Sequence, residues 1–92
     1  MKGSERAKLR ALANTLEPIV HIGKEGITEN LVKQVDDALT ARELIKGTVQ
    51  KNCDIPVRDC AHILAEELEA ECIQVIGRRF TLYREKPEEP ID

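Results

Sequence analysis

The chain has 92 residues and a formal net charge of −3 at pH 7; 41% of its residues are hydrophobic and 34% are charged. This length suits one domain with a thin core and excludes a second. No apolar run is long enough to span a membrane, and the N-terminus has no secretory apolar segment, so we expect a cytoplasmic protein.

The net negative charge comes from the C-terminus. Residues 85–92, EKPEEPID, contain four acidic residues and one basic residue, so residues 1–84 contain 13 of each. We expect this tail, which also contains two prolines, to be disordered beside a single folded domain over residues 1–84. Because the first ten residues hold four bases and one acid, a basic surface patch and a nucleic-acid partner are compatible with the net charge.

The first half of the chain is predicted to form a helix, a strand and a second helix. Apolar residues at helical spacing indicate a helix over residues 4–16 with Ser4 as its N-cap. The β-branched run IVHI indicates a short strand over residues 19–22. Thr28 is placed to cap the second helix, whose apolar stripe extends to Leu39.

The second half is predicted to form a strand, a helix and a β-hairpin. The segment ELIKGTV, residues 43–49, indicates a strand in which Gly47 marks close packing or a bulge. A helical pattern then extends over about residues 54–70. Residues 72–84 indicate a hairpin with a type II′ turn at residues 77–78, where glycine can adopt the positive φ that this turn needs.

The two-residue turn sets the pairing of the hairpin. The expected pairs are Ile76 with Arg79, Val75 with Phe80, Gln74 with Thr81, Ile73 with Leu82, and Cys72 with Tyr83. The side chains expected to face the core are Ile73, Val75, Phe80 and Leu82.

These elements predict an α/β fold with the order helix, strand, helix, strand, helix, strand, strand. Strands joined through helices favour parallel pairing, and the hairpin adds an antiparallel strand. We therefore expect a two-layer arrangement of three helices and a four-stranded mixed sheet, with the helices on one face. The other face would then be partly open and lined by residues such as Lys46, Gln74, Arg79 and Tyr83.

Two glycines flank a lysine and a glutamate in GKEG, residues 23–26, between the first strand and the second helix. A backbone without Cβ atoms can approach a ligand closely, and the start of a helix favours an anion such as a phosphate. Lys24 adds a mobile positive charge, whereas Glu25 opposes it. KH modules use a GxxG loop against nucleotide backbones, but glycines also suit any strand-to-helix turn, so both interpretations remain open at this point.

Other chemistries lack their motifs. Neither the GxxxxGK[ST] pattern of P-loops nor the GxGxxG pattern of dinucleotide-binding folds occurs in the chain. Three cysteines, Cys53, Cys60 and Cys72, and two histidines show no metal-ligand spacing, and no nucleophile, base and orienting group fall together. We therefore expect reduced thiols, no metal, no cofactor, no small-molecule substrate and no catalytic residues.

Four stretches in order resemble the CRM domain family, in particular its small stand-alone bacterial members of YhbY type. They are LRALA, GKEG, ALTARELIKG and IQVIGRRFTLYR, and the resemblance covers residues 5–84. It implies a fold similar to the C-terminal domain of translation initiation factor three, with RNA as the partner. Small bacterial members of this family are linked to pre-ribosomal particles and to maturation of the large ribosomal subunit.

The resemblance implies that residues 23–26 form an RNA-contacting loop, with Lys46 and Arg84 at basic positions of the family pattern; the exposed hairpin turn adds two arginines. The residues expected to contact RNA are thus Gly23, Lys24, Glu25, Gly26, Lys46, Arg78, Arg79 and Arg84. We expect a non-catalytic protein that binds ribosomal RNA during large-subunit assembly. An alternative is a protein-interaction module that docks on a ribosomal or assembly protein through the acidic stretch EELEAE, residues 66–71, or through the acidic tail.

Overall fold

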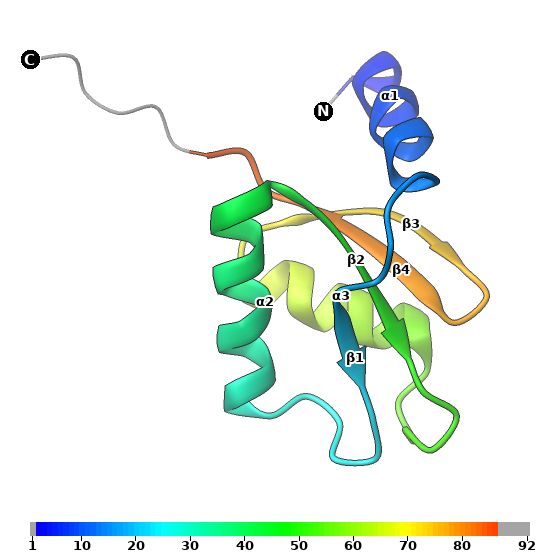
Figure 1. The fold of residues 1–92 in the computed structure, drawn as a ribbon, viewed down its shortest axis with the longest axis vertical. Coiled ribbons are helices and arrows are strands. Elements are labelled where there is room, and N and C mark those ends of the chain that lie inside the picture. Colours follow the sequence, from blue (N-terminus) through cyan, green and yellow to red (C-terminus); the bar gives the residue numbers. More distant parts are fainter. Residues whose placement is uncertain (1, 87–92) are drawn as a thin grey trace, which may run out of the picture.

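The computed structural model describes residues 2–86, and Figure 1 shows helices packed around a twisted sheet. The elements follow the predicted order. They are α1 (Gly3–Ala13), β1 (Val20–Ile22), α2 (Glu29–Arg42), β2 (Leu44–Val49), α3 (Val57–Glu67), β3 (Glu71–Ile76) and β4 (Arg79–Tyr83). Most of the predicted disordered tail, residues 87–92, lies outside the described residues.

The sheet is mixed, with the strand order β1-β2-β4-β3. β1 and β2 are parallel, because α2 carries the chain back between them, while β4 is antiparallel to both of its neighbours. The predicted α/β fold of three helices and a four-stranded mixed sheet is thereby confirmed. The parallel pairing places Ile22 opposite Val49, so the loops that follow β1 and β2 leave the sheet at the same end.

The main core lies between the sheet and the helices α2 and α3. Apolar residues at helical spacing in the helices and at alternate positions in the strands supply it. The predicted close packing at Gly47 is present, because the buried ring of Phe80 lies directly against this glycine. The buried members of this core are Val20, Ile22, Leu31, Val35, Leu39, Ile45, Val49, Cys60, Ala61, Leu64, Ala65, Phe80 and Leu82.

α1 does not join the other two helices. It contacts β2 and β3. Gln74 of β3 donates a hydrogen bond of 3.3 Å to Asn14 at the end of α1. The next residue of β3, Val75, packs against the core. Since successive residues of a strand point to opposite faces, α1 lies over the second face of the sheet. Figure 1 shows the segment after α1 running across the sheet to β1. The expectation that all three helices cover one face was therefore wrong, because an apolar stripe on a helix does not specify the face it covers.

The hairpin has the predicted register near its turn and a different one farther away. The pairs of Gln74, Val75 and Ile76 are those expected. Beyond them an irregularity at Ile73 shifts β3 by one residue, so that Cys72 faces Leu82 and Glu71 faces Tyr83. The predicted pairs of Ile73 and Cys72 were therefore wrong. A β-bulge inserts one extra residue on one strand, and here it lets Cys72 pack against the core while Ile73 is buried outside the core cluster.

Four helix boundaries differ from the prediction, two in α1 and two in α3. α1 begins after Lys2, which is the N-cap residue but forms no side-chain capping hydrogen bond. Ser4, the predicted N-cap, therefore lies inside the helix. α1 ends at Ala13 instead of residue 16. α3 begins only after Pro56, because the residue before a proline is disfavoured in helical conformation. It ends before Glu69, whose φ of +54° cannot continue a helix.

The start of α2 is the one predicted. The side-chain oxygen of Thr28 accepts a hydrogen bond of 3.1 Å from the N–H of Leu31. Replacing Thr28 by alanine removes this acceptor and is expected to lower the free energy of unfolding by about 1 kcal/mol. Urea unfolding followed by circular dichroism measures the loss. Ser4→Ala, which removes an exposed hydroxyl inside α1, is the control and should be neutral or slightly stabilising; an equal loss in both variants would contradict the cap.

Candidate functional site

The predicted loop, residues 23–26, is a tight turn at the end of β1. The N–H of Gly26 donates a hydrogen bond of 3.0 Å to the carbonyl oxygen of Gly23, which closes the turn. Gly26 has a φ of +70°, a left-handed conformation that favours glycine. Lys24 and Glu25, at the centre of the turn, are exposed. The turn therefore presents one base and one acid to solvent, while its Gly26 N–H is engaged internally.

The loop after β2 lies beside this turn. A Cβ atom on Gly23 would come within 3.1 Å of the side-chain oxygen of Gln50, and the backbone N–H of Gln50 donates to the carbonyl oxygen of Ile22 at 2.8 Å. Lys51, the next residue, is exposed. The sequence offered only the polar run QKN as a signal for this loop, and such runs are common to many loops. Lys51 thus adds a second lysine to this end of the sheet.

The turn of the β3–β4 hairpin is at the same end. The carbonyl oxygen of Arg78 accepts hydrogen bonds from the N–H of Val49 at 2.8 Å and from the hydroxyl of Thr48 at 3.3 Å. Gly77 has a φ of +58°, as the predicted type II′ turn requires. Arg78 and Arg79 are exposed. Three neighbouring loops therefore form what we call the basic end, which consists of residues 23–26, Lys51, Arg78 and Arg79.

A shallow hollow separates the turn of residues 23–26 from the start of α2. Its lining includes His21, Glu25, Thr28 and Asn30. The first N–H groups of α2 and the partial positive charge of the helix start favour an anion here, but the Glu25 carboxylate lines the same hollow and opposes one. The attraction of this turn for a phosphate therefore depends on Lys24, which is not part of the hollow.

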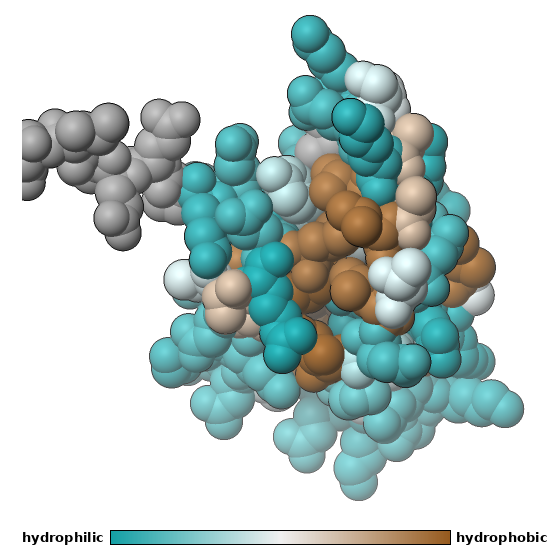
Figure 2. All heavy atoms as spheres, turned by 45° about the horizontal axis from the view of Figure 1, so that its top comes forward, coloured by the Kyte–Doolittle hydropathy of each residue, from teal (hydrophilic) through white to brown (hydrophobic). Residues whose placement is uncertain are grey.

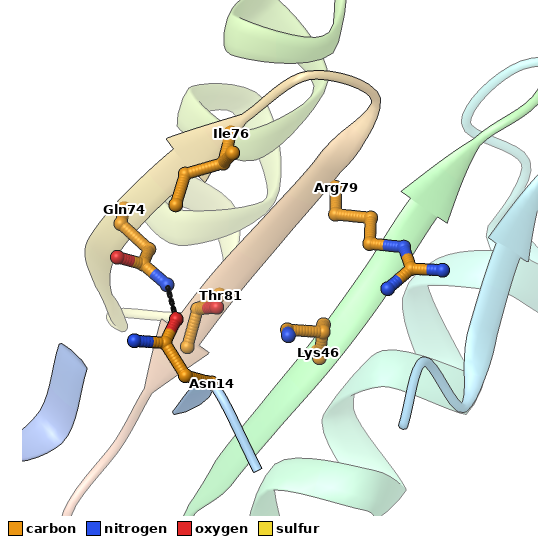
Figure 3. Close-up of a pocket in the computed structure, with 6 residues that line it drawn as sticks. All are labelled: Asn14, Lys46, Gln74, Ile76, Arg79 and Thr81. Atoms are coloured by element: carbon orange, nitrogen blue, oxygen red, sulfur yellow. Dashed lines mark hydrogen bonds between the residues drawn. The ribbon is translucent and has the colours of Figure 1, made fainter. Parts of the chain in front are cut away.

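Lys46 lies away from the basic end, in a pocket on the second face of the sheet. Only 8% of Lys46 is exposed. Figure 3 shows it sharing this pocket with Arg79 of the neighbouring strand β4. Val49, at the end of β2, is three positions farther along the strand than Lys46, which corresponds to about 10 Å at ~3.3 Å per residue. Arg79 is thus common to the pocket and to the basic end.

Arg84 lies at the opposite end of the sheet, where its guanidinium donates four hydrogen bonds to protein groups. Nη1 donates to Oδ1 of Asp36 at 2.7 Å and to the carbonyl oxygen of Leu68 at 3.1 Å. Nη2 donates to the carbonyl oxygen of Asp36 at 3.1 Å and to the hydroxyl of Thr40 at 2.9 Å. These bonds join α2, the end of α3 and the end of β4. The geometry gives Arg84 a structural role, and its contact with RNA stays a prediction.

The end of the sheet that contains Arg84, opposite the basic end, is acidic. The pKa of Tyr83 is raised, first by burial and then by the negative charges of Glu85, Glu43 and Glu5. A large hollow between α1 and the hairpin contains four glutamates against two basic residues, arranged around Leu9, Leu12 and Tyr83. Figure 2 shows hydrophobic side chains gathered on the face that this view brings forward, bordered by hydrophilic ones. This end therefore disfavours the backbone of a nucleic acid.

The three cysteines are free thiols, as predicted. Burial raises the pKa of Cys60 to about 11, with smaller contributions from Cys53 and Asp59, and burial also raises the pKa of Cys72. Both thiols therefore stay protonated near neutral pH, where a protonated thiol is a poor nucleophile. Within residues 2–86 no three His, Cys, Asp or Glu side chains gather as the ligands of a metal would. No helix of this part of the chain is both long and apolar enough to cross a membrane.

Comparison with known proteins finds one family. The model of the CRS1/YhbY (CRM) domain matches residues 1–84. The chain is 39% identical over 88 residues to "Probable RNA-binding protein YqeI" of Bacillus subtilis, with 96% of this chain and 92% of that protein covered. It is 40% identical over 86 residues to "Probable RNA-binding protein MJ0652" of Methanocaldococcus jannaschii, with 91% and 63% covered. The solution structure of the hypothetical protein SAV1595 from Staphylococcus aureus has a TM-score of 0.80 and 42% identity, over 98% of this chain and 94% of that one.

Proposed function

The chain belongs to the CRS1/YhbY (CRM) domain family, and we propose from this membership and from the geometry of the basic end that it is a non-catalytic RNA-binding protein of the cytoplasm. Both relatives carry RNA binding in their names. The family resemblance points to ribosomal RNA as the target and to assembly of the large ribosomal subunit as the process.

The observation that carries the proposal is the gathering of basic side chains on three adjacent loops at one end of the sheet. Lys24, Lys51, Arg78 and Arg79 are all exposed there. The chain contains one phenylalanine, which is buried, and one tyrosine, which lies at the opposite end. The basic end therefore has no aromatic platform on which bases could stack. Contacts to backbone phosphates, which depend on charge, are the binding mode that these residues support.

Replacing Lys24 or Lys51 by alanine is expected to weaken binding to a fragment of precursor large-subunit RNA roughly threefold each, and about tenfold together. Each lysine that neutralises a phosphate releases counterions, so each replacement should reduce the slope of log affinity against log salt by about 1. Fluorescence anisotropy of the labelled RNA at salt concentrations between about 50 and 200 mM measures both quantities.

Arg42→Ala is the matched control. Arg42 is an exposed base at the C-terminal end of α2, about 20 Å along the helix from the turn of residues 23–26. It should leave the affinity and the salt slope unchanged. Binding that is indifferent to salt, or equal effects of the Lys24, Lys51 and Arg42 replacements, would contradict a phosphate-binding basic end.

A protein-interaction module is the second candidate, and the hollow beside α1 favours it. There Leu12 is 55% exposed next to four glutamates. Deletion of residues 85–92 separates the two functions. Loss of association with ribosomal particles in the deletion variant, with Lys24→Ala unaffected, would favour docking on a protein; the reverse result would favour RNA.

A further inference from the structure

The pocket on the second face of the sheet holds polar groups without partners. Its cavity has a volume of about 150 Å³ and is lined by Asn14, Lys46, Gln74, Ile76, Arg79 and Thr81. A cavity of this size exceeds the ~10–15 Å³ that one water requires, so it can take a small ligand. Figure 3 shows the Lys46 side chain on the same side of the sheet as Arg79, with its ammonium directed towards Thr81 and Asn14.

Thr81 supplies a hydroxyl that is held inside the protein. The residue is only 1% exposed, and its Oγ1 atom has no hydrogen-bond partner among residues 2–86. A buried hydroxyl without a partner destabilises a folded protein. In this pocket it becomes a donor ready for the oxygen of a ligand.

The charge of the pocket is positive. Lys46 and Arg79 are its charged members, no carboxylate lines it, and neither base forms an ion pair within the described part of the chain. The Lys46 residue is mostly buried, and its ammonium has no counter-charge among residues 2–86; buried charges in proteins are usually paired. An anion in the pocket would supply the counter-charge that Lys46 lacks, and the exposed Arg79 side chain on the same face of the sheet can contact the same anion.

We propose that this pocket binds one phosphate group, held by the Lys46 ammonium, the Arg79 guanidinium and the Thr81 hydroxyl. The inference deepens the proposed function and rests on it. Arg79 belongs to the basic end as well as to the pocket, and Lys46 lies about 10 Å along β2 from that end. An RNA backbone that crosses the hairpin turn therefore reaches the pocket. A free phosphate ion has the same chemistry, and the experiment separates the two sources.

The test uses the full chain labelled for NMR, titrated separately with inorganic phosphate and with a short oligoribonucleotide that has no terminal phosphate. Signals of Lys46, Arg79 and Thr81 should shift with the oligonucleotide. Lys46→Met keeps the length of the side chain without its charge, and should weaken this response about tenfold, as expected for one charge-assisted hydrogen bond. Lys8→Met, at an exposed base in α1, is the control and should respond like the wild type.

Thr81→Val gives a signature that a merely structural threonine would not show. Valine keeps the shape and removes the unpartnered hydroxyl, so the variant should have a higher Tm and yet bind the oligonucleotide several-fold more weakly. Because stability and affinity change in opposite directions, a folding defect cannot account for the weaker binding. A higher Tm with wild-type affinity would overturn the role of Thr81 as a ligand.

The remaining outcomes separate this inference from the proposed function. If RNA shifts the basic end but neither RNA nor phosphate shifts the pocket, the pocket proposal is overturned and RNA binding stands. If phosphate shifts the pocket while no RNA binds, the phosphate site is supported as one for the free ion and the proposed function fails. A third titration uses hexaglutamate as an acidic peptide. Preferential binding of this peptide in the pocket would overturn the proposal.

Discussion

Gly47→Ala is expected to lower the free energy of unfolding by about 2 kcal/mol. An alanine Cβ would lie 2.8 Å from Cε1 and 2.9 Å from Cε2 of Phe80, and closer still to Cζ. The ring is fully buried, so it has no free space to move into, and overpacking of this kind costs about 1 to 3 kcal/mol. The lower entropy of the unfolded chain offsets only about 0.4 to 1 kcal/mol of that cost.

Phe80→Leu makes this prediction specific. Leucine lacks the three outer ring atoms that the new Cβ would meet, so alanine at position 47 should be tolerated in the Phe80→Leu background. The two changes combined should therefore cost about 2 kcal/mol less than the sum of the single changes, measured by urea unfolding in a double-mutant cycle. Gly3→Ala, at an exposed helical glycine with open space around it, is the control and should not destabilise. Additive effects of the two core changes would show that the ring moves aside.

The case of Gly47 shows what local sequence can predict. A glycine inside a β-branched strand indicates that something approaches closely, and this was predicted. The identity of the approaching group was not, because it depends on the pairing of β2 with β4, which places Gly47 opposite Phe80 across 33 residues of chain. The same holds for the fold as a whole. Element types and order follow from periodicity within each segment, whereas contacts between segments depend on register.

Two predictions were wrong because they concerned contacts between segments, which the pattern within one segment does not specify. The pairing beyond Gln74 was wrong because an extra residue at Ile73 shifts the strand, and an apolar residue at a bulge looks like any other core residue in sequence. The position of α1 was wrong because its apolar residues indicate a buried side but not the sheet face that provides it. α1 lies on the second face of the sheet, and its C-cap residue Asn14 lines the pocket that contains Lys46, where an open surface was expected.

The candidate site was predicted in part for the same reason. Lys24 and the hairpin arginines were proposed from the sequence because glycine-containing turns expose their neighbours, and the structure shows these three side chains exposed. Lys51 was missed, since nothing in QKN indicates that the loop after β2 lies beside the loop after β1. That placement follows from the parallel pairing of the two strands. Arg84 was included on charge and family pattern alone, which do not reveal that its partners come from residues 36, 40 and 68.

Arg84→Met is expected to lower the free energy of unfolding by about 2 to 3 kcal/mol. The change removes four hydrogen bonds and leaves the Asp36 carboxylate and the carbonyl oxygen of Leu68 without their partner. Bonds to a charged group contribute about 1.5 to 3 kcal/mol, and breaking a fully buried pair costs about 3 to 5 kcal/mol. The side chains here are partly exposed, 23% for Arg84 and 48% for Asp36. The expected loss is therefore smaller than the loss for most fully buried pairs.

Arg84→Lys distinguishes a structural role from contact with RNA. Lysine keeps the positive charge but lacks the planar fork that reaches Asp36, Leu68 and Thr40 at once. If Arg84 acts as a structural clamp, both variants should lose most of its stabilisation in urea unfolding. At a temperature where both remain folded, both should bind precursor RNA with wild-type affinity and salt slope. If Arg84 instead contacts a phosphate, Arg84→Lys should retain RNA binding while Arg84→Met loses it, and Arg84 would then belong to the RNA interface despite its distance from the basic end.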